Sequence, residues 1–208
     1  MVFSDRFEAG ELLARKLAVY RDDPNTIVVA LPRGGVPVAQ VIAKTLHLPM
    51  DIFFVKKIPS PYNPEAAIGA ISENGMEYIN ERAVAMLNVA RPYIDEQEAK
   101  ILEGIRQKRT IYNKPRLDVQ GKRVILVDDG VATGASMYLA AKALKAEGAK
   151  EVIIAVPVAP PDSIALLKEA ADGVVVIDVP VDFMAVGQFY RDFHQLSDEE
   201  VKELLDSV

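Results

Sequence analysis

The segment Val124–Ser136, with the sequence VILVDDGVATGAS, decides the fold of this chain of 208 residues. Its first four residues are apolar and rich in β-branched side chains, which is typical of a strand buried inside a parallel sheet. Two carboxylates, Asp128 and Asp129, follow where this strand is expected to end. A turn of small residues comes next, and good helix formers continue through Ala140–Glu147. The segment therefore predicts a strand, an acidic pair, a tight turn and a helix.

The turn after the acidic pair is suited to a phosphate group. A tight turn at the start of a helix leaves backbone N–H groups without partners, and these groups attract anions. Two carboxylates beside such a turn can hold ribose hydroxyls or a hydrated Mg²⁺ ion. The segment therefore predicts a sugar-phosphate site, formed by Asp128, Asp129, Gly130, Val131, Ala132, Thr133, Gly134, Ala135 and Ser136.

A second turn with ligand-binding character is Leu31–Pro37, with the sequence LPRGGVP. It follows another apolar strand pattern, and its glycines permit close approach of the backbone to a ligand. Free N–H groups together with the guanidinium of Arg33 suit a pyrophosphate. A plain strand-to-helix turn would explain Gly34 and Gly35 but not the arginine.

The rest of the chain alternates between strand and helix patterns, which predicts an α/β domain with a mostly parallel sheet. Ligands bind such sheets at the carboxyl ends of the strands, where both turns belong. Further strands are expected at Thr26–Leu31, Asp51–Val55, Ala67–Ser72, Met76–Ile79, Glu151–Val156 and Val174–Ile177. Helices are expected at Arg6–Tyr20, Val36–Leu46, Glu81–Asn88, Tyr93–Ile111, Pro161–Ala171, Val186–Phe193 and Asp198–Leu205.

Composition excludes several classes of protein. A net charge of −6 argues against a chain that binds nucleic acid over its whole surface. Without cysteine the chain has no disulfide, thiolate zinc site or cysteine nucleophile, and only His47 and His194 could serve a histidine-dependent site. Charges are spread through residues 1–20, so we expect no signal peptide, no membrane span and a cytoplasmic location.

Taken together, the two turns resemble those of the type I phosphoribosyltransferases. VILVDDGVATGAS resembles the family's motif for phosphoribosyl pyrophosphate (PRPP), and LPRGG resembles its pyrophosphate loop, closest to the form in bacterial xanthine-guanine enzymes. The resemblance implies the Rossmann-like, parallel-sheet α/β fold of this family in a single domain over residues 1–208. We expect its core at about 1–80 and 117–178, a helical insertion at about 81–116 and a small C-terminal hood at about 179–208.

The resemblance also implies an activity, the transfer of a 5-phosphoribosyl group from PRPP to a nucleobase-like nitrogen acceptor, with Mg²⁺ and release of pyrophosphate. Asp128 and Asp129 would hold the ribose hydroxyls, and Mg²⁺ through ribose or water, while residues 131–136 would hold the 5′-phosphate. Arg33, Gly34 and Gly35 would bind pyrophosphate, together with one of two lysines that follow the second strand. The residues assigned a catalytic role are Asp128, Asp129, Lys56 and Lys57.

Segments that would select the acceptor match the family less well. In the proline-rich segment Ile58–Ala66, which corresponds to the family's catalytic loop, Tyr62, Asn63 and Glu65 could touch ligand. Phe183 corresponds to the aromatic residue that stacks on the base, although it could equally pack the hood onto the core. Many 6-oxopurine enzymes have an acid where this chain has Ala132, and a lysine before the last strand, where Lys168 is the nearest. These departures disfavour hypoxanthine or guanine as the acceptor.

Other assignments stay open. The basic residues of Tyr93–Arg116 are typical of a solvated helix face, but the cluster at Arg106–Arg109 could turn a cation toward phosphate or form a homodimer contact. A protein of this fold could sense PRPP or a nucleotide without turnover. A receiver-like or phosphatase domain with Asp128 as phosphoacceptor is a third reading. The acidic net charge disfavours a nucleic-acid partner in each case.

Overall fold

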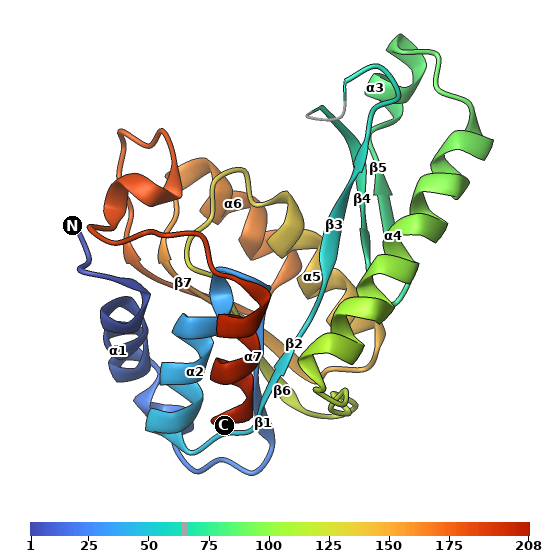
Figure 1. The fold of residues 1–208 in the computed structure, drawn as a ribbon. Coiled ribbons are helices and arrows are strands. Elements are labelled where there is room, and N and C mark those ends of the chain that lie inside the picture. Colours follow the sequence, from blue (N-terminus) through green and yellow to red (C-terminus); the bar gives the residue numbers. More distant parts are fainter. Residues whose placement is uncertain (64–65) are drawn as a thin grey trace.

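The computed structural model describes residues 1–63 and 66–208. These residues form a five-stranded parallel sheet in the order β2-β1-β6-β7-β8 and a three-stranded antiparallel sheet in the order β3-β4-β5 (Figure 1). The strands of the larger sheet are β1 (Thr26–Ala30), β2 (Met50–Ile52), β6 (Arg123–Val127), β7 (Glu151–Val158) and β8 (Gly173–Asp178). The smaller sheet contains β3 (Val55–Pro59), β4 (Ala67–Ser72) and β5 (Glu77–Ile79).

Both faces of the parallel sheet are buried, which explains the unbroken apolar run in β6. Ile125 and Val127 face one core, and Val124 and Leu126 face the other. The first core is shared with α1 (Arg6–Lys16), α2 (Gly35–Leu46) and α7 (Asp198–Asp206). The second is shared with α5 (Ala135–Ala146) and α6 (Pro161–Ala170). Because side chains alternate along a strand, a sheet covered on both faces needs apolar residues at every position.

The smaller sheet belongs to an arm, residues 55–112, that projects from the parallel sheet (Figure 1). The arm also contains α3 (Glu81–Met86) and α4 (Arg91–Tyr112), and a separate apolar cluster around Ile58, Ile68 and Ile94 holds it together. Helix α4 runs back along the small sheet to the parallel sheet and brings its C-terminal end close to α7. Among the described helices, none is long and apolar enough to cross a membrane.

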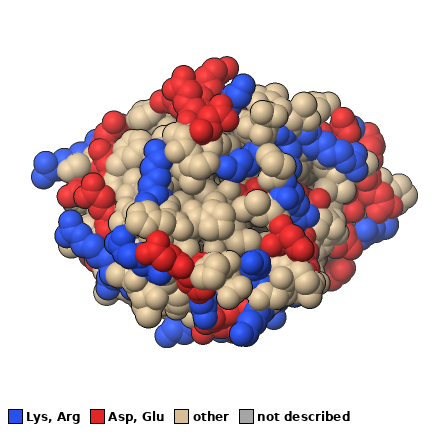
Figure 2. Space-filling model, turned by 90° about the horizontal axis from the view of Figure 1, so that it is seen from below, with Lys and Arg blue, Asp and Glu red and all other residues tan. Residues whose placement is uncertain are grey.

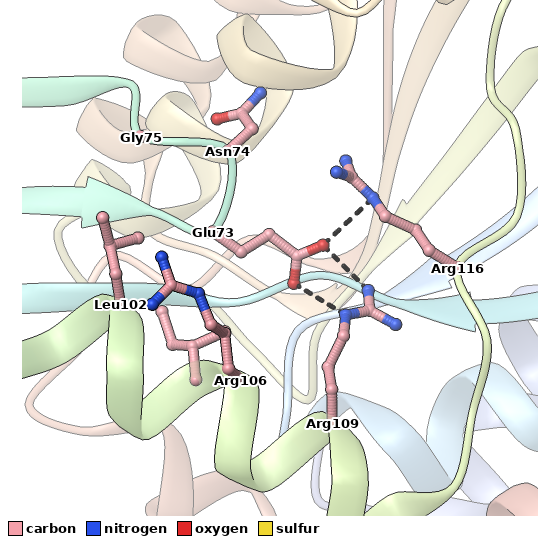
Figure 3. A pocket seen from close by; sticks show the side chains of 8 residues that line it. Glu73, Asn74, Gly75, Leu102, Arg106, Arg109 and Arg116 are labelled. Carbon is pink, nitrogen blue, oxygen red and sulfur yellow. Dashed lines mark hydrogen bonds and ion pairs between the residues drawn. The ribbon is translucent and has the colours of Figure 1, made fainter.

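An ion-pair cluster fastens the arm to the parallel sheet (Figure 3). The buried carboxylate of Glu73 accepts from Arg109 at 2.8 Å and lies 3.2 Å from Nε of Arg116. Arg109 also lies 3.2 Å from Asp51 of β2, so one guanidinium joins the two sheets. Burial raises the pKa of Glu73, whereas its hydrogen bond to Arg109 lowers that pKa. Basic and acidic groups are therefore balanced at this junction, which is a structural feature rather than an open anion site.

Four sequence-based boundaries were wrong. The helix expected at Arg6–Tyr20 ends at Lys16, and a separate 3₁₀ turn covers Ala18–Tyr20. The predicted strand Asp51–Val55 is divided between two sheets, because the buried side chains of Phe53 and Phe54 pack into opposite cores and turn the chain from β2 into β3. Strand β3 then continues to Pro59, although the expected loop segment begins at Ile58. The predicted helix Val186–Phe193 is only a short 3₁₀ turn, Val186–Phe189, since Tyr190 becomes extended and pairs with Phe3.

Other elements agree with the sequence-based expectations. Helix α7 begins at a capping box in which Ser197 accepts from the N–H of Glu200, and α1 begins where Asp5 caps its first turn. The strands expected at Ala67–Ser72 and Met76–Ile79 are β4 and β5, and a hairpin turn at Asn74-Gly75 joins them, with Gly75 at φ +84°. The helix after the acidic pair begins at Ala135, directly after the turn, and includes the expected Ala140–Ala146 part.

Candidate functional site

The two predicted ligand-binding turns lie side by side at the carboxyl edge of the parallel sheet. Strands β1 and β6 are neighbours with Ala30 opposite Val127, and the N–H of Leu31 donates to the Val127 carbonyl at 2.9 Å. A Cβ atom on Gly34 would overlap the Asp129 carboxylate, and one on Gly35 would lie 2.7 Å from the Val127 oxygen. Only glycine fits this approach. Because Gly34 and Gly35 carry no side chain, the acidic pair Asp128–Asp129 can pack directly against their turn.

Asp129 is held in place by residues from both ends of the chain. Its carboxylate accepts from Nε of Arg6 at 2.8 Å, and both side chains are almost fully buried. Tyr190 donates its hydroxyl proton to the Asp129 carbonyl at 2.6 Å. Arg6 also donates to the carbonyl of His194 and lies 4.0 Å above the ring of Phe193. Sequence reasoning missed Arg6, because nothing in an amphipathic helix pattern marks its first residue as a partner of a distant carboxylate.

Asp128 lies beside Asp129 without a basic partner of its own among the described contacts. Burial raises the pKa of Asp128 well above its ordinary value, and the charge of Asp129 raises it further. Burial also raises the pKa of Asp129, but the hydrogen bond from Arg6 opposes that change. Of the two acids, Asp128 is therefore the one whose negative charge is not balanced by the protein, and it is the one available to a polar ligand.

The turn of residues 130–136 presents backbone N–H groups at the start of α5. Gly134 precedes the helix with φ +83°, and no side chain caps the first turn. Thr133 is exposed and Ser136 is partly exposed, so both hydroxyls can reach a ligand. Two hydrogen bonds fix the turn in place. The N–H of Val131 donates to the Val158 carbonyl, and the Ser163 hydroxyl donates to the carbonyl of Ala132. N–H groups and hydroxyls at the start of a helix suit an anion, and the phosphate site of this turn stays a prediction.

Beside this turn, the hood (residues 179–208) borders a pocket of about 630 Å³, here called the hood pocket. Phe183 lines it and also stacks on Phe189 at 5.4 Å between ring centroids, so both of its expected roles are compatible with its position. Val181 and Met184 are 89% and 92% exposed at its rim. The hood pocket is lined by Ala132, Thr133, Pro160, Pro161, Asp162, Ser163, Val181, Phe183 and Met184.

On the other side of the acidic pair lies a smaller pocket of about 240 Å³, here called the cationic pocket. Arg33 and Lys56 both line it, whereas Lys57, the next residue of β3, does not. Burial lowers the pKa of Lys56, and the nearby charges of Lys108 and Arg33 lower it further. The peptide bond between Pro32 and Arg33 is cis. The cationic pocket is lined by Pro32, Arg33, Phe54, Lys56, Lys108, Tyr112 and Asp198.

The expected catalytic loop follows β3, and its contacts are mostly local. The N–H of Tyr62 donates to the hydroxyl of Ser60 at 3.3 Å, and the Tyr62 side chain is 72% exposed. Asn63 accepts a backbone hydrogen bond from Ala66 at 3.0 Å. Neither side chain lines the two pockets above. Glu65 lies outside the described residues.

Within residues 1–63 and 66–208, no cluster of three or more His, Cys, Asp or Glu side chains could hold a metal ion by itself. Mg²⁺ commonly takes only one or two protein carboxylates and completes its shell with water and substrate phosphate. Asp128, with no basic partner, and Asp129 beside it fit that incomplete kind of donor set.

A parallel sheet that carries both turns at adjacent strand ends defines a type I phosphoribosyltransferase fold. The family model described as "Phosphoribosyl transferase domain" matches residues 6–193, so the chain belongs to that family. Family members bind PRPP and a nucleobase-like acceptor.

Individual relatives agree with this membership. A Mycobacterium tuberculosis protein named "Putative phosphoribosyl transferase" is 41% identical over 207 residues, which cover 99% of this chain and 46% of that protein. The chain thus spans about half the length of this curated relative. The crystal structure of TT1426 from Thermus thermophilus is 41% identical with a TM-score of 0.81, covering 99% of this chain and 98% of that one. An amidophosphoribosyltransferase of Archaeoglobus fulgidus is 29% identical over 64% of this chain and 28% of its own length.

Proposed function

We propose that the chain transfers the 5-phosphoribosyl group of PRPP to a nitrogen of a nucleobase-like acceptor and releases pyrophosphate. The observation that carries this proposal is the packing of Gly34 and Gly35 against the Asp128–Asp129 pair, beside the open turn of residues 130–136. The two turns supply sites for pyrophosphate, ribose and 5′-phosphate along one sheet edge.

Each described group has a role in this reaction. Asp128 accepts hydrogen bonds from the ribose hydroxyls, while Asp129, held by Arg6, fixes the position of its neighbour. The N–H groups of residues 131–136 and the hydroxyls of Thr133 and Ser136 bind the 5′-phosphate. Arg33 and Lys56 bind the pyrophosphate that departs. Catalysis then depends on holding both substrates in line and on stabilising the charge that develops on the leaving group.

Magnesium fits this assignment as a partner of the substrate. Mg²⁺ bound to PRPP would neutralise charge on the leaving pyrophosphate, and Asp128 and Asp129 would contact it through ribose or water.

The hood pocket is the site proposed for the acceptor. It lies next to the 5′-phosphate turn, and Phe183 offers a ring on which a planar base can stack. Its lining combines mostly apolar side chains with few polar ones, and Ala132 stands where many 6-oxopurine enzymes have an acid. We therefore do not assign a 6-oxopurine to it.

The test is calorimetric titration of the purified chain with PRPP and Mg²⁺, followed by a pyrophosphate-release assay with each common nucleobase. We expect PRPP to bind and one acceptor to release stoichiometric pyrophosphate. Binding of PRPP without release for any base would favour the sensor that this fold also allows. Failure to bind PRPP would refute the proposal for both the enzyme and the PRPP sensor.

The receiver-like reading and the nucleic-acid reading receive no comparable support. The family model that matches residues 6–193 is that of a phosphoribosyl transferase domain, not of a receiver or phosphatase domain. Figure 2 shows basic and acidic side chains interspersed on one face of the molecule rather than one continuous basic area.

A further inference from the structure

The cationic pocket draws residues from four separate parts of the chain. Arg33 comes from the turn after β1, and Lys56 comes from β3 of the arm. Lys108 and Tyr112 lie one turn apart on α4, in the segment expected to be a helical insertion. Asp198 is the first residue of α7 in the hood. The insertion and the hood thus both reach the edge of the sheet where the pyrophosphate turn lies.

The carboxylate of Asp198 occupies the centre of this group. It forms an ion pair with Nζ of Lys108, accepts from the hydroxyl of Tyr112 at 2.8 Å and lies 3.9 Å from the guanidinium of Arg33. Lys56 is close enough for the Asp198 charge to raise its pKa, against the larger effects of burial and of the two neighbouring cations. Three cations therefore surround one carboxylate, which leaves an excess of positive charge in a protein of net charge −6.

These cations remain reachable. The side chains of Lys108 and Arg33 are 39% and 37% exposed, and that of Asp198 is 25% exposed. Ion pairs at this level of exposure contribute little to stability. A pyrophosphate carries more charge and more acceptor oxygens than a carboxylate, and hydrogen bonds to it are charge-assisted. It can therefore compete with Asp198 for the same partners.

The position of Lys108 is fixed rather than incidental. Tyr112, one turn further along α4, is buried and stacks on Phe54 at 6.2 Å between ring centroids. Ile105, one turn earlier, is buried in the same core. Residues three and four apart share one face of a helix, so Lys108 must project toward the pocket rather than away from it.

We propose that Lys108 of the helical insertion is a pyrophosphate ligand of this site, together with Arg33 and Lys56, and that Asp198 is the internal anion that pyrophosphate displaces. This inference rests on the proposed function, since it deepens the assignment of the same site. The helical insertion would then be part of the substrate site. Binding of pyrophosphate would break the ion pair between Lys108 of the insertion and Asp198 of the hood.

The experiment measures the affinity of the full chain for inorganic pyrophosphate by calorimetry at fixed ionic strength. We expect Lys108→Ala to weaken binding about tenfold or more, because it removes a charged hydrogen bond to phosphate. Lys100→Ala is the matched control, since Lys100 lies on the same helix, is 62% exposed and pairs with Glu96. It should leave the affinity unchanged. Equal affinity of Lys108→Ala and the unmodified chain would overturn the proposal.

The variant Asp198→Asn separates a ligand role from a structural one. It breaks the same ion pair as Lys108→Ala, but it removes the competing anion and keeps the cation, and asparagine can still accept from Tyr112. We expect it to tighten pyrophosphate binding several-fold. If Lys108 merely ties α4 to α7, both variants should weaken binding alike, and that result would also overturn the proposal. Thermal unfolding of each variant confirms that it is folded before titration.

A titration with PRPP distinguishes failure of this inference from failure of the proposed function. If the unmodified chain binds PRPP but not pyrophosphate, the inference falls and the proposed function stands. If it binds neither, both fall.

Discussion

The two ends of the site are built in opposite ways. The end proposed for ribose and pyrophosphate is charged and closely packed, with Asp129 9% exposed and glycine backbone in contact with carboxylates. The end proposed for the acceptor is more apolar and more open, with Val181 and Met184 almost fully exposed at its rim. A binding site made from buried charges tolerates few substitutions, since each charge needs its partner. An exposed apolar rim tolerates many.

This difference separates two kinds of information in the chain. The charged end is specified by short motifs on adjacent strands, and it lies within the residues that the family model matches. The open end is the part that we propose selects the acceptor, and a fold does not by itself fix a substrate. The predictions below test whether the two ends are as independent as their construction indicates.

The largest effect is expected from Asp128→Asn at the charged end. Asparagine keeps the shape of the side chain but cannot match a carboxylate as an acceptor for ribose hydroxyls. We expect the rate of pyrophosphate release to fall at least a hundredfold, with PRPP binding weakened. The measurement is a steady-state assay with the acceptor identified by the titrations above.

The matched control for this variant is Asp118→Asn, an exposed carboxylate in the connector before β6. It should retain full activity. An Asp128→Asn enzyme with activity within threefold of the unmodified chain would remove Asp128 from the ribose site.

The next effect concerns the stability of the charged end. Arg6→Met leaves the Asp129 carboxylate buried without its ion-pair partner, which typically costs about 3–5 kcal/mol. Chemical denaturation should show this loss, and Arg15→Met, an exposed position on the same helix, should show almost none. In the double variant Arg6→Met/Asp129→Asn part of the loss should be recovered. Additive losses would mean that Arg6 stabilises the chain only through packing.

The sequence predicted the charged end better than it predicted its surroundings. Residues 124–136 and 31–37 encode strand, turn and proposed ligand contact in one local pattern, and the structure brings both turns together as expected. Arg6 and Asp198 could not be assigned, because each acts across more than 80 residues of sequence. Lys108 belongs to the Arg106–Arg109 cluster, for which a contact with phosphate was one of two assignments that the sequence left open. The sequence could not decide between Lys56 and Lys57. Which lysine faces the cationic pocket depends on where β3 begins. Apolar periodicity does not reveal the break between β2 and β3, because Phe53 and Phe54 are both buried.

At the open end, Phe183→Ala should change acceptor use alone. Stacking of a base on an aromatic ring is worth about 1–3 kcal/mol, so the KM for the acceptor should rise roughly tenfold. The Kd for PRPP should change by less than twofold, because Phe183 lies in the hood pocket and not among the PRPP contacts. Val19→Ala, which is 81% exposed and distant from the site, is the control. A parallel loss of PRPP affinity would show that the two ends are coupled.

The smallest effect is a pH dependence of stability, which arises from the titration of Asp128. Its folded-state pKa lies well above the usual value because of burial and the charge of Asp129, so ionisation opposes folding. The folded state then binds more protons than the unfolded one, and stability falls as pH rises from about 4.

Asp128→Asn removes this titration, so its melting temperature should exceed that of the unmodified chain at pH 7.5, by about 2–4 °C for each kcal/mol. The difference should shrink as the pH falls below about 4, because Asp128 then becomes protonated in both states, and Asp118→Asn should show no such trend. Thermal unfolding at a series of pH values measures it, and a pH-independent difference would mean that the charge on Asp128 is already compensated inside the protein.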